Sequence, residues 1–85
     1  MRLYTIEFSS LVRKQLKRIP KKDSRKIVEK IESLAVDPRP YGFKKLVYHV
    51  ESFRVRVGNY RIIYSIFDRQ LIVCVVEIAD RRDAY

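Results

Sequence analysis

The stretch FRVRVGNYRIIY, residues 53–64, decides the fold. Apolar and basic residues alternate through Phe53–Val57, which is the period of a half-buried β-strand. Gly58-Asn59 is then a two-residue turn with glycine in its first position, as a type II′ turn requires, and Tyr60–Phe67 is the returning strand. The stretch therefore predicts a β-hairpin whose register is set by its turn.

The predicted register brings like charges together on one face of the hairpin. Arg56 is expected directly opposite Arg61, and Arg54 lies two residues away on the same face. The other face should pack under helices and carries Phe53, Val55, Val57, Tyr60, Ile62 and Tyr64. Two unit charges about 6 Å apart repel by roughly 0.7 kcal/mol in water and by about 3 kcal/mol at an effective dielectric constant of 20. An anion bound between the arginines is the simplest reason for this arrangement. The alternative is that the guanidinium groups splay apart and cover an exposed sheet.

Outward from the hairpin, the sequence predicts two helices and two more strands. In chain order these are a strand over Leu3–Phe8, a helix over Ser10–Ile19, a helix over Asp23–Val36, a loop over Asp37–Lys45 and, after the hairpin and a turn at Asp68–Gln70, a strand over Leu71–Ile78. Ser9 or Ser10 is the expected N-cap of the first helix and Asp23 that of the second, while Leu46–Ser52 is ambiguous. The order β-α-α-β-β-β predicts an α+β fold, with a helical hairpin packed on a mostly antiparallel four-stranded sheet.

Length and composition exclude several classes of protein. The 85 residues allow one domain, spanning 1–85. The longest apolar run, Leu71–Val76, is far shorter than the ~20 residues that span a bilayer, and no signal-peptide pattern follows Met1. We therefore expect a cytoplasmic protein with no membrane partner. One cysteine cannot form an internal disulfide, and with one histidine a zinc site with the usual four protein ligands is out of reach unless carboxylates or another chain help. No metal and no cofactor are therefore expected. Cys74 is predicted to be a core side chain.

Net charge points to a polyanionic partner. Lysine and arginine number 19 against 10 acidic residues, which gives +9. The excess is spread along the chain, since residues 1–37 carry ten basic and five acidic groups and residues 38–85 carry nine and five. Such a charge favours nucleic acid or the ribosome. The alternative is a soluble basic protein whose lysines are only solvated.

The end of the chain extends the arginine face. Because the last strand runs antiparallel to Tyr60–Phe67, its carboxyl end should emerge beside Arg61. Arg81 and Arg82 can then join the same cluster, and Tyr85 can reach its rim. Guanidinium groups that bind phosphate beside an aromatic ring that stacks on a base are typical of RNA recognition.

These residues resemble the RelE/ParE toxin superfamily, on its RelE-like branch. The resemblance rests on the stretch at 53–64, on the early strand ending at Phe8, on Lys45-Leu46 before the sheet, and on Arg81 followed by Tyr85. It implies the toxin of a type II toxin–antitoxin pair that acts as a ribosome-dependent, metal-independent mRNA endonuclease and so inhibits translation. In this activity the 2′-hydroxyl attacks the adjacent phosphodiester in the ribosomal A site. The implied partners are a cognate antitoxin, acidic or amphipathic-helical, with the ribosome and mRNA, and operator DNA only through the antitoxin complex.

The resemblance also implies roles for individual residues. Arg54 and Arg56 match basic positions near the nucleophile, where relatives often have lysine. Arg61 matches an arginine that grips the phosphate, and Arg81 one that stabilises the transition state or protonates the leaving oxygen. Tyr85 matches a tyrosine that stacks on or orients the nucleotide. The further residues expected to contact RNA are Lys44, Lys45 and Arg82.

Two questions stay open from the sequence. Guanidinium groups keep their protons at neutral pH, so the general base is unassigned, and Tyr85 would need a lowered pKa to serve. The function also has two alternatives on the same scaffold. One is a non-nucleolytic, ParE-like inhibitor of DNA gyrase, and the other is a basic nucleic-acid-binding module without catalysis.

Overall fold

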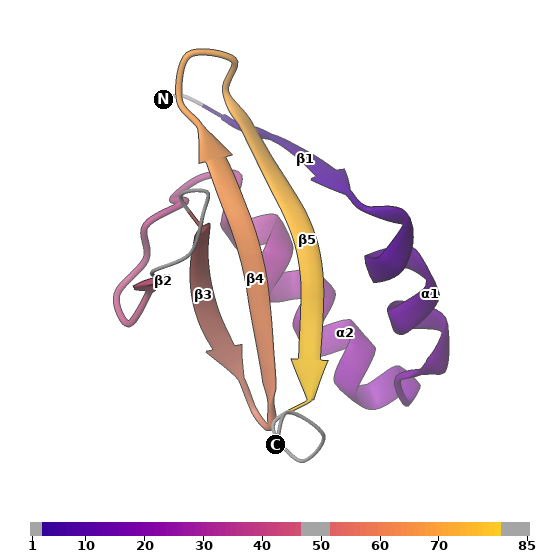
Figure 1. Ribbon diagram of the computed structural model, residues 1–85. Helices are drawn as coiled ribbons and strands as arrows, with labels where there is room; N and C mark the ends of the chain where they lie inside the picture. The colour runs from indigo at the N-terminus through magenta and orange to yellow at the C-terminus, as the bar shows by residue number, and fades with distance from the viewer. Residues whose placement is uncertain (1–2, 47–51, 81–85) are drawn as a thin grey trace.

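The computed structural model describes residues 3–46 and 52–80, which form one sheet and two helices (Figure 1). The elements are β1 (Thr5–Phe8), α1 (Ser10–Arg18), α2 (Lys21–Ser33), β2 (Lys44–Leu46), β3 (Ser52–Val57), β4 (Tyr60–Phe67) and β5 (Ile72–Asp80). The strand order is β1-β5-β4-β3-β2, with β1 parallel to β5 and every other neighbouring pair antiparallel. The predicted α+β fold is thus confirmed, with five strands in the sheet where four were expected.

The β3–β4 hairpin has the register that its turn predicts. Arg56 lies opposite Arg61, and Val57 opposite Tyr60. Gly58 has φ +57°, and among the described non-glycine residues only Leu71 has a positive φ. A positive φ at the first turn residue alone is the type II′ geometry, whose twist matches that of the flanking strands. The turn therefore assigns every side chain of both strands to its face.

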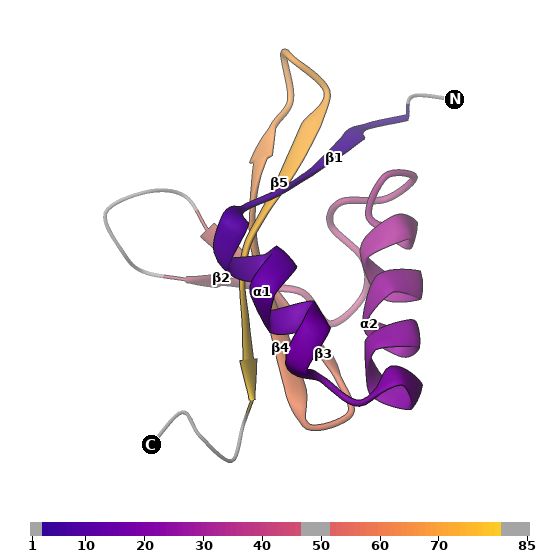
Figure 2. The same cartoon turned by 90° about the vertical axis from the view of Figure 1, so that its right-hand side faces the viewer.

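The core lies between the sheet and the helices. In Figure 1, α2 lies behind β3 and β4, and α1 packs beside β5; Figure 2 shows α2 on one side of the sheet and α1 in front of β5, at the edge of the sheet. The buried side chains are Val12, Ile27, Ile31, Leu34, Phe53, Val55, Tyr60, Ile62, Tyr64, Val73, Val75 and Ile78. Tyr4, Ile6 and Phe8, in β1 and just before it, are partly buried and pack against this cluster. Neither described helix has the length and apolar character needed to cross a membrane.

The second helix begins two residues earlier than predicted. The backbone N–H groups of Asp23 and Ser24 both donate to the carbonyl oxygen of Pro20, at 2.9 Å, so the first turn closes on the proline. Proline suits this boundary because its fixed φ is compatible with helix initiation and it has no N–H to leave unpaired. Asp23 is therefore not the N-cap but lies in the first turn, where a carboxylate favours the helix dipole. Its Oδ2 accepts a hydrogen bond from Tyr60 Oη at 3.4 Å.

The fifth strand is β2, which lies where a loop and an ambiguous segment were predicted. Lys44 pairs with Arg54 and Leu46 with Ser52, so β2 adds to the free edge of β3. Three residues are too few for a period-2 pattern to stand out. The pairing is set by the neighbouring strand edge.

Side chains of α1 hold the carboxyl half of β5. Ser9 caps α1, its Oγ accepting from Val12 N at 3.1 Å, and the same hydroxyl donates to the carbonyl oxygen of Val76 at 2.9 Å. Gln15 Oε1 accepts from Ile78 N at 2.8 Å. Between these contacts the β4–β5 ladder shifts register by one residue, as at a β-bulge. The outer edge of β5 pairs with β1 only over its first half. Past that point, side chains of α1 and its N-cap form hydrogen bonds with the backbone groups of β5.

The loop after α2 is attached to the core by a buried tyrosine. Tyr64 is fully buried, and its hydroxyl donates to the carbonyl oxygen of Pro38 at 2.7 Å. At the same end, Arg39 binds both carboxylate oxygens of Asp68, at 3.2 and 2.9 Å, and the Tyr4 hydroxyl donates to Asp68 at 2.7 Å. These contacts fix the start of the segment that leads into β2.

Replacing Ser9→Ala should destabilise the fold by about 1–2 kcal/mol, since it removes a helix cap and leaves the Val76 carbonyl without its hydroxyl donor. Urea unfolding at constant m-value measures the change. Ser24→Ala is the matched control because that hydroxyl donates only to Lys21 O on an exposed helix turn. Equal stabilities of the two variants would contradict the proposed tie between α1 and β5.

Burial raises the pKa of Tyr64 to about 12. Because the neutral phenol is favoured in the folded protein, its contribution is complete below the unfolded value of about 10 and is lost as pH rises through about 12. Between pH of about 10 and about 12, the free energy of unfolding should therefore fall about 2–3 kcal/mol less in Tyr64→Phe than in the parent protein. Parallel alkaline losses in the two proteins would show that Tyr64 does not control this transition.

Candidate nucleic-acid interface

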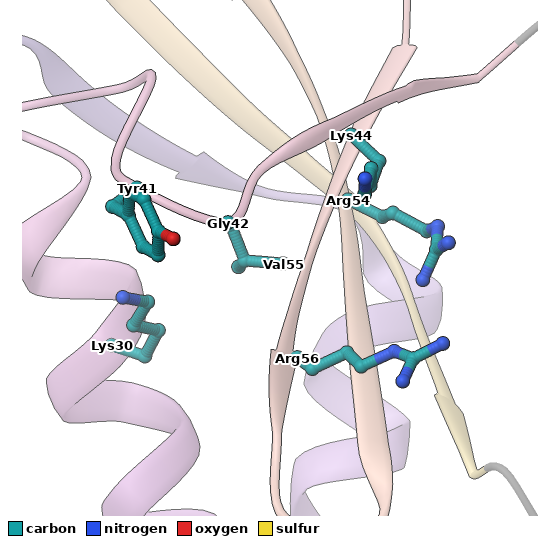
Figure 3. A pocket seen from close by; sticks show the side chains of 7 residues that line it. All are labelled: Lys30, Tyr41, Gly42, Lys44, Arg54, Val55 and Arg56. Atoms are coloured by element: carbon teal, nitrogen blue, oxygen red, sulfur yellow. The ribbon is translucent and has the colours of Figure 1, made fainter.

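Four basic residues form a cationic face on the sheet: Lys44, Arg54, Arg56 and Arg61. Two cross-strand pairs build it, because Lys44 lies opposite Arg54 and Arg56 lies opposite Arg61. Figure 3 shows Arg54 and Arg56 extending to the same side of β3, while Val55 between them points the other way. The predicted convergence of the three arginines on the face opposite the core is therefore what the register produces.

The arginines of β3 are not neutralised by carboxylates within the described part of the chain. Arg54 is half-buried and Arg56 is exposed, and neither side chain has an ion pair or hydrogen bond there. An ion pair does form between Arg39 and Asp68, at the far end of β4. Arg54 and Arg56 therefore place two like charges on one face of β3, and a bound anion would be attracted to both.

A pocket of about 380 Å³ adjoins the cationic face at the edge of β3. Its lining residues are Lys30, Tyr41, Gly42, Lys44, Arg54, Val55 and Arg56. None of these is acidic, and four carry a positive charge. In Figure 3, Lys30 and Tyr41 lie on one side of β3 while Arg54 and Arg56 extend from the other, so the pocket passes around the strand edge.

The other predicted RNA contacts divide into two groups. Lys45 lies opposite Phe53, whose side chain belongs to the core face, so alternation directs Lys45 away from Lys44. The structure therefore separates these two lysines. Arg81, Arg82 and Tyr85 lie outside the described residues.

Cys74 differs from its prediction as a core side chain. It is half-buried, between Glu7 on β1 and Ser65 on β4. Burial, with a smaller effect of Glu7, raises the pKa of the Cys74 thiol, so the thiolate needed for nucleophilic attack is disfavoured. Within residues 3–46 and 52–80, no three His, Cys, Asp or Glu side chains gather as they would to hold a metal ion.

Lys30 and Tyr41 are pocket residues that the sequence did not single out. Lys30 belongs to the polar side of an amphipathic helix, where lysine is ordinary. The available signal was the loop itself, in which Tyr41 and Phe43 alternate with basic residues from Arg39 to Lys45. Helical and strand periodicity do not bring α2 and this loop together, so the pocket depends on the tertiary fold.

Guanidinium groups in this arrangement suit phosphate chemistry. Each offers a planar fork of donors that matches two phosphate oxygens, and partial burial strengthens the attraction. They remain protonated at neutral pH, so they can bind and stabilise negative charge but cannot accept a proton. The cationic face can therefore hold a phosphodiester and stabilise charge that develops during its cleavage.

Comparisons with known proteins show the family of the chain. The family model described as the ParE toxin of type II toxin–antitoxin systems, parDE, matches residues 6–85. A protein of Methanocaldococcus jannaschii named putative toxin RelE1 is 32% identical, with 96% of this chain and 94% of that protein covered.

Two solved structures share the fold throughout. A chain of the archaeal RelE–RelB complex from Pyrococcus horikoshii OT3 superposes with a TM-score of 0.83 at 26% identity, covering 96% of this chain and 99% of that one. A chain of the toxin–antitoxin complex RelBE2 from Mycobacterium tuberculosis gives 0.84 at 28% identity, covering 98% and 97%.

Replacing Arg56→Thr should stabilise the isolated protein at low salt by a few tenths to about 1 kcal/mol, because it removes the charge opposite Arg61. The gain should shrink between about 0.01 M and about 1 M salt, where the Debye length falls from about 30 Å to about 3 Å. Urea unfolding at both salt concentrations measures it, and Arg69→Thr in the exposed β4–β5 turn is the control. A gain that does not depend on salt would mean that strand propensity, not charge repulsion, sets the difference.

Proposed function

The chain belongs to the RelE/ParE superfamily of toxins from type II toxin–antitoxin systems, and we propose that it is a ribosome-dependent toxin of this superfamily. In this proposal it is a metal-independent endoribonuclease that cuts mRNA in the ribosomal A site. The observation that carries the proposal is the opposed pair Arg56 and Arg61, with Arg54 alongside on the same face. An RNA-cutting enzyme needs such a group around a phosphate, whereas a toxin that only binds a protein target does not.

In the proposed reaction, the 2′-oxygen of the ribose attacks the adjacent phosphorus and the bond from phosphorus to the 5′-oxygen breaks. The products are a 2′,3′-cyclic phosphate and a 5′-hydroxyl, so one proton leaves the attacking oxygen and one reaches the leaving oxygen. Arg61 is assigned to the phosphate, with Arg54 and Arg56 near the nucleophile. Positioning of the nucleotide and stabilisation of negative charge then supply most of the acceleration.

The carboxyl-terminal residues complete the proposed machinery. Arg81 is assigned to the developing charge or to the leaving oxygen, and Tyr85 to orienting the nucleotide. Arg82 and Lys44 would hold the RNA backbone. Lys45, which the fold directs to the other face, would contact RNA or ribosome only from outside the cationic face.

The partners follow from the same proposal. Both solved relatives described above are toxin–antitoxin complexes, which supports a cognate antitoxin for this chain. With a toxin of net charge +9, an acidic or amphipathic-helical antitoxin has the complementary chemistry. Contact with operator DNA is assigned to the complex, where the antitoxin supplies the DNA-binding part.

A ParE-like action on DNA gyrase is the second candidate. It is favoured by one observation, which is that the family model matching residues 6–85 is described as the parDE toxin. On that alternative the cationic face would bind a protein or DNA surface and leave messages uncut.

Arg61→Ala should reduce mRNA cleavage on translating ribosomes by at least about 100-fold, the usual cost of removing one preorganised donor to a developing oxyanion. Primer extension maps the cuts, and Arg61→Lys should recover only part of the rate because it lacks the bidentate fork. Arg69→Ala, an arginine of the β4–β5 turn, serves as the control.

The outcome also separates the candidates. Cuts within codons that disappear in Arg61→Ala support the nuclease. Intact messages together with inhibited supercoiling by gyrase would replace it with the second candidate. Induction that leaves growth and messages unaffected would leave a basic binding module.

A further inference from the structure

We propose that the pocket at the β3 edge is a binding subsite for a nucleotide that flanks the scissile phosphate, with the ring of Tyr41 stacking on its base and Lys30 binding its phosphate. The proposal rests on the nuclease function above, whose scissile phosphate lies at the cationic face. The subsite extends the RNA path from that face around the edge of β3 to the side of the helices.

Local structure presents Tyr41 outward on a fixed turn. Phe43 N donates to the carbonyl oxygen of Pro40 at 3.0 Å, and Gly42 has φ +90°, which together are the geometry of a type II turn with Tyr41 at its second position. The turn is anchored by Phe43, whose ring lies 5.7 Å from that of Phe53. Tyr41 is fully exposed, at 105% of its reference accessible area.

A fully exposed ring on an anchored turn is suited to stacking. Aromatic side chains stabilise a fold mainly by burial, and Tyr41 buries nothing. Stacking on a base needs a ring with its faces open and its backbone already ordered, so little conformational entropy is lost on binding. Tyr41 meets both conditions, and it lies in the pocket that Arg54 and Arg56 also line.

The electrostatics of the pocket favour a strand of RNA over other ligands. Its four cations belong to three separate elements, with Lys30 on α2, Lys44 on β2, and Arg54 and Arg56 on β3. A row of cationic side chains with an aromatic ring beside it is typical of proteins that bind single-stranded nucleic acid. An acidic peptide would bind the cationic side chains but has no need of an exposed aromatic ring. The pocket volume of about 380 Å³ is within the range of small-ligand sites.

Continuity with the cationic face sets the direction of the strand. Strand β2 ends its pairing at Lys44, opposite Arg54, so in the described residues the edge of β3 beyond that point is not covered by a strand. A backbone held at Arg56 and Arg61 can therefore cross this open edge beside Val55, next to Arg54, to reach Tyr41 and Lys30. The flanking base then lies next to Gly42, where the space beside the backbone is open.

The test uses single-stranded RNA of about eight nucleotides, made uncleavable by 2′-O-methyl groups and bearing one abasic position that is moved along the strand. Fluorescence anisotropy gives the affinity. With the parent protein, one abasic position should weaken binding by about 5- to 100-fold, as expected from the loss of one stacked base. Tyr41→Leu should weaken the intact RNA similarly and make it insensitive to that abasic position, whereas Tyr41→Phe should bind like the parent.

Lys30→Ala gives an independent measurement. The slope of log affinity against log salt concentration should fall by about 0.7, the value for one phosphate contact on a single strand. Phe67→Leu is the matched control for an exposed aromatic residue, because Phe67 is 45% exposed at the opposite end of β4. It should change neither the affinity nor the salt slope.

Three results would contradict the subsite or separate its failure from that of the proposed function. Normal RNA binding by Tyr41→Leu overturns the subsite. If the same variant binds RNA normally but loses affinity for a Glu- and Asp-rich peptide, the pocket belongs to a protein partner instead. If Tyr41→Leu binds RNA normally while Arg61→Ala abolishes cleavage, only the subsite fails. If Arg61→Ala cuts normally, the proposed function fails, whatever Tyr41 does.

Discussion

The register of one β-hairpin is the constraint on which the rest of the structure depends. A two-residue type II′ turn at Gly58-Asn59 leaves a single pairing for β3 and β4. A slip of one residue would send Val55 and Ile62 to solvent and bring arginines under the helices, at a large cost in buried charge. The same alternation that builds the core therefore also gathers the arginines on the opposite face.

The sequence alone predicted the structure correctly wherever a local pattern of residues determines it. The hairpin, its core face and the opposition of Arg56 to Arg61 followed from period-2 alternation and one turn. Strand β2 did not, because three residues acquire strand structure only by pairing with an edge that the folded sheet provides. Asp23 failed as a helix cap because Pro20 already closes the first turn, a competition between two start signals that residue types alone do not rank.

The candidate site divides in the same way between local and tertiary information. Its arginines lie on one hairpin, so the sequence could place them relative to one another. Lys30 and Tyr41 reach the site from α2 and from the following loop, and their approach depends on how α2 packs on β3 and β4. The loop itself is directed by contacts far from the site, among them the hydrogen bond from Tyr64 to the Pro38 carbonyl. No local pattern encodes such a contact between residues 26 positions apart.

Arginine rather than lysine on this face restricts the chemistry available to it. A lysine in a crowded cationic site can lose its proton and act as a base, while a guanidinium keeps its charge through the physiological range. Repulsion between Arg54 and Arg56 on β3 therefore cannot be relieved by deprotonation, whereas a bound anion would relieve it. A phosphodiester gains charge as it passes to the pentacoordinate transition state, so fixed cations attract the transition state more strongly than the ground state. The fixed positive charge of this face would thus be the source of the differential binding that accelerates cleavage.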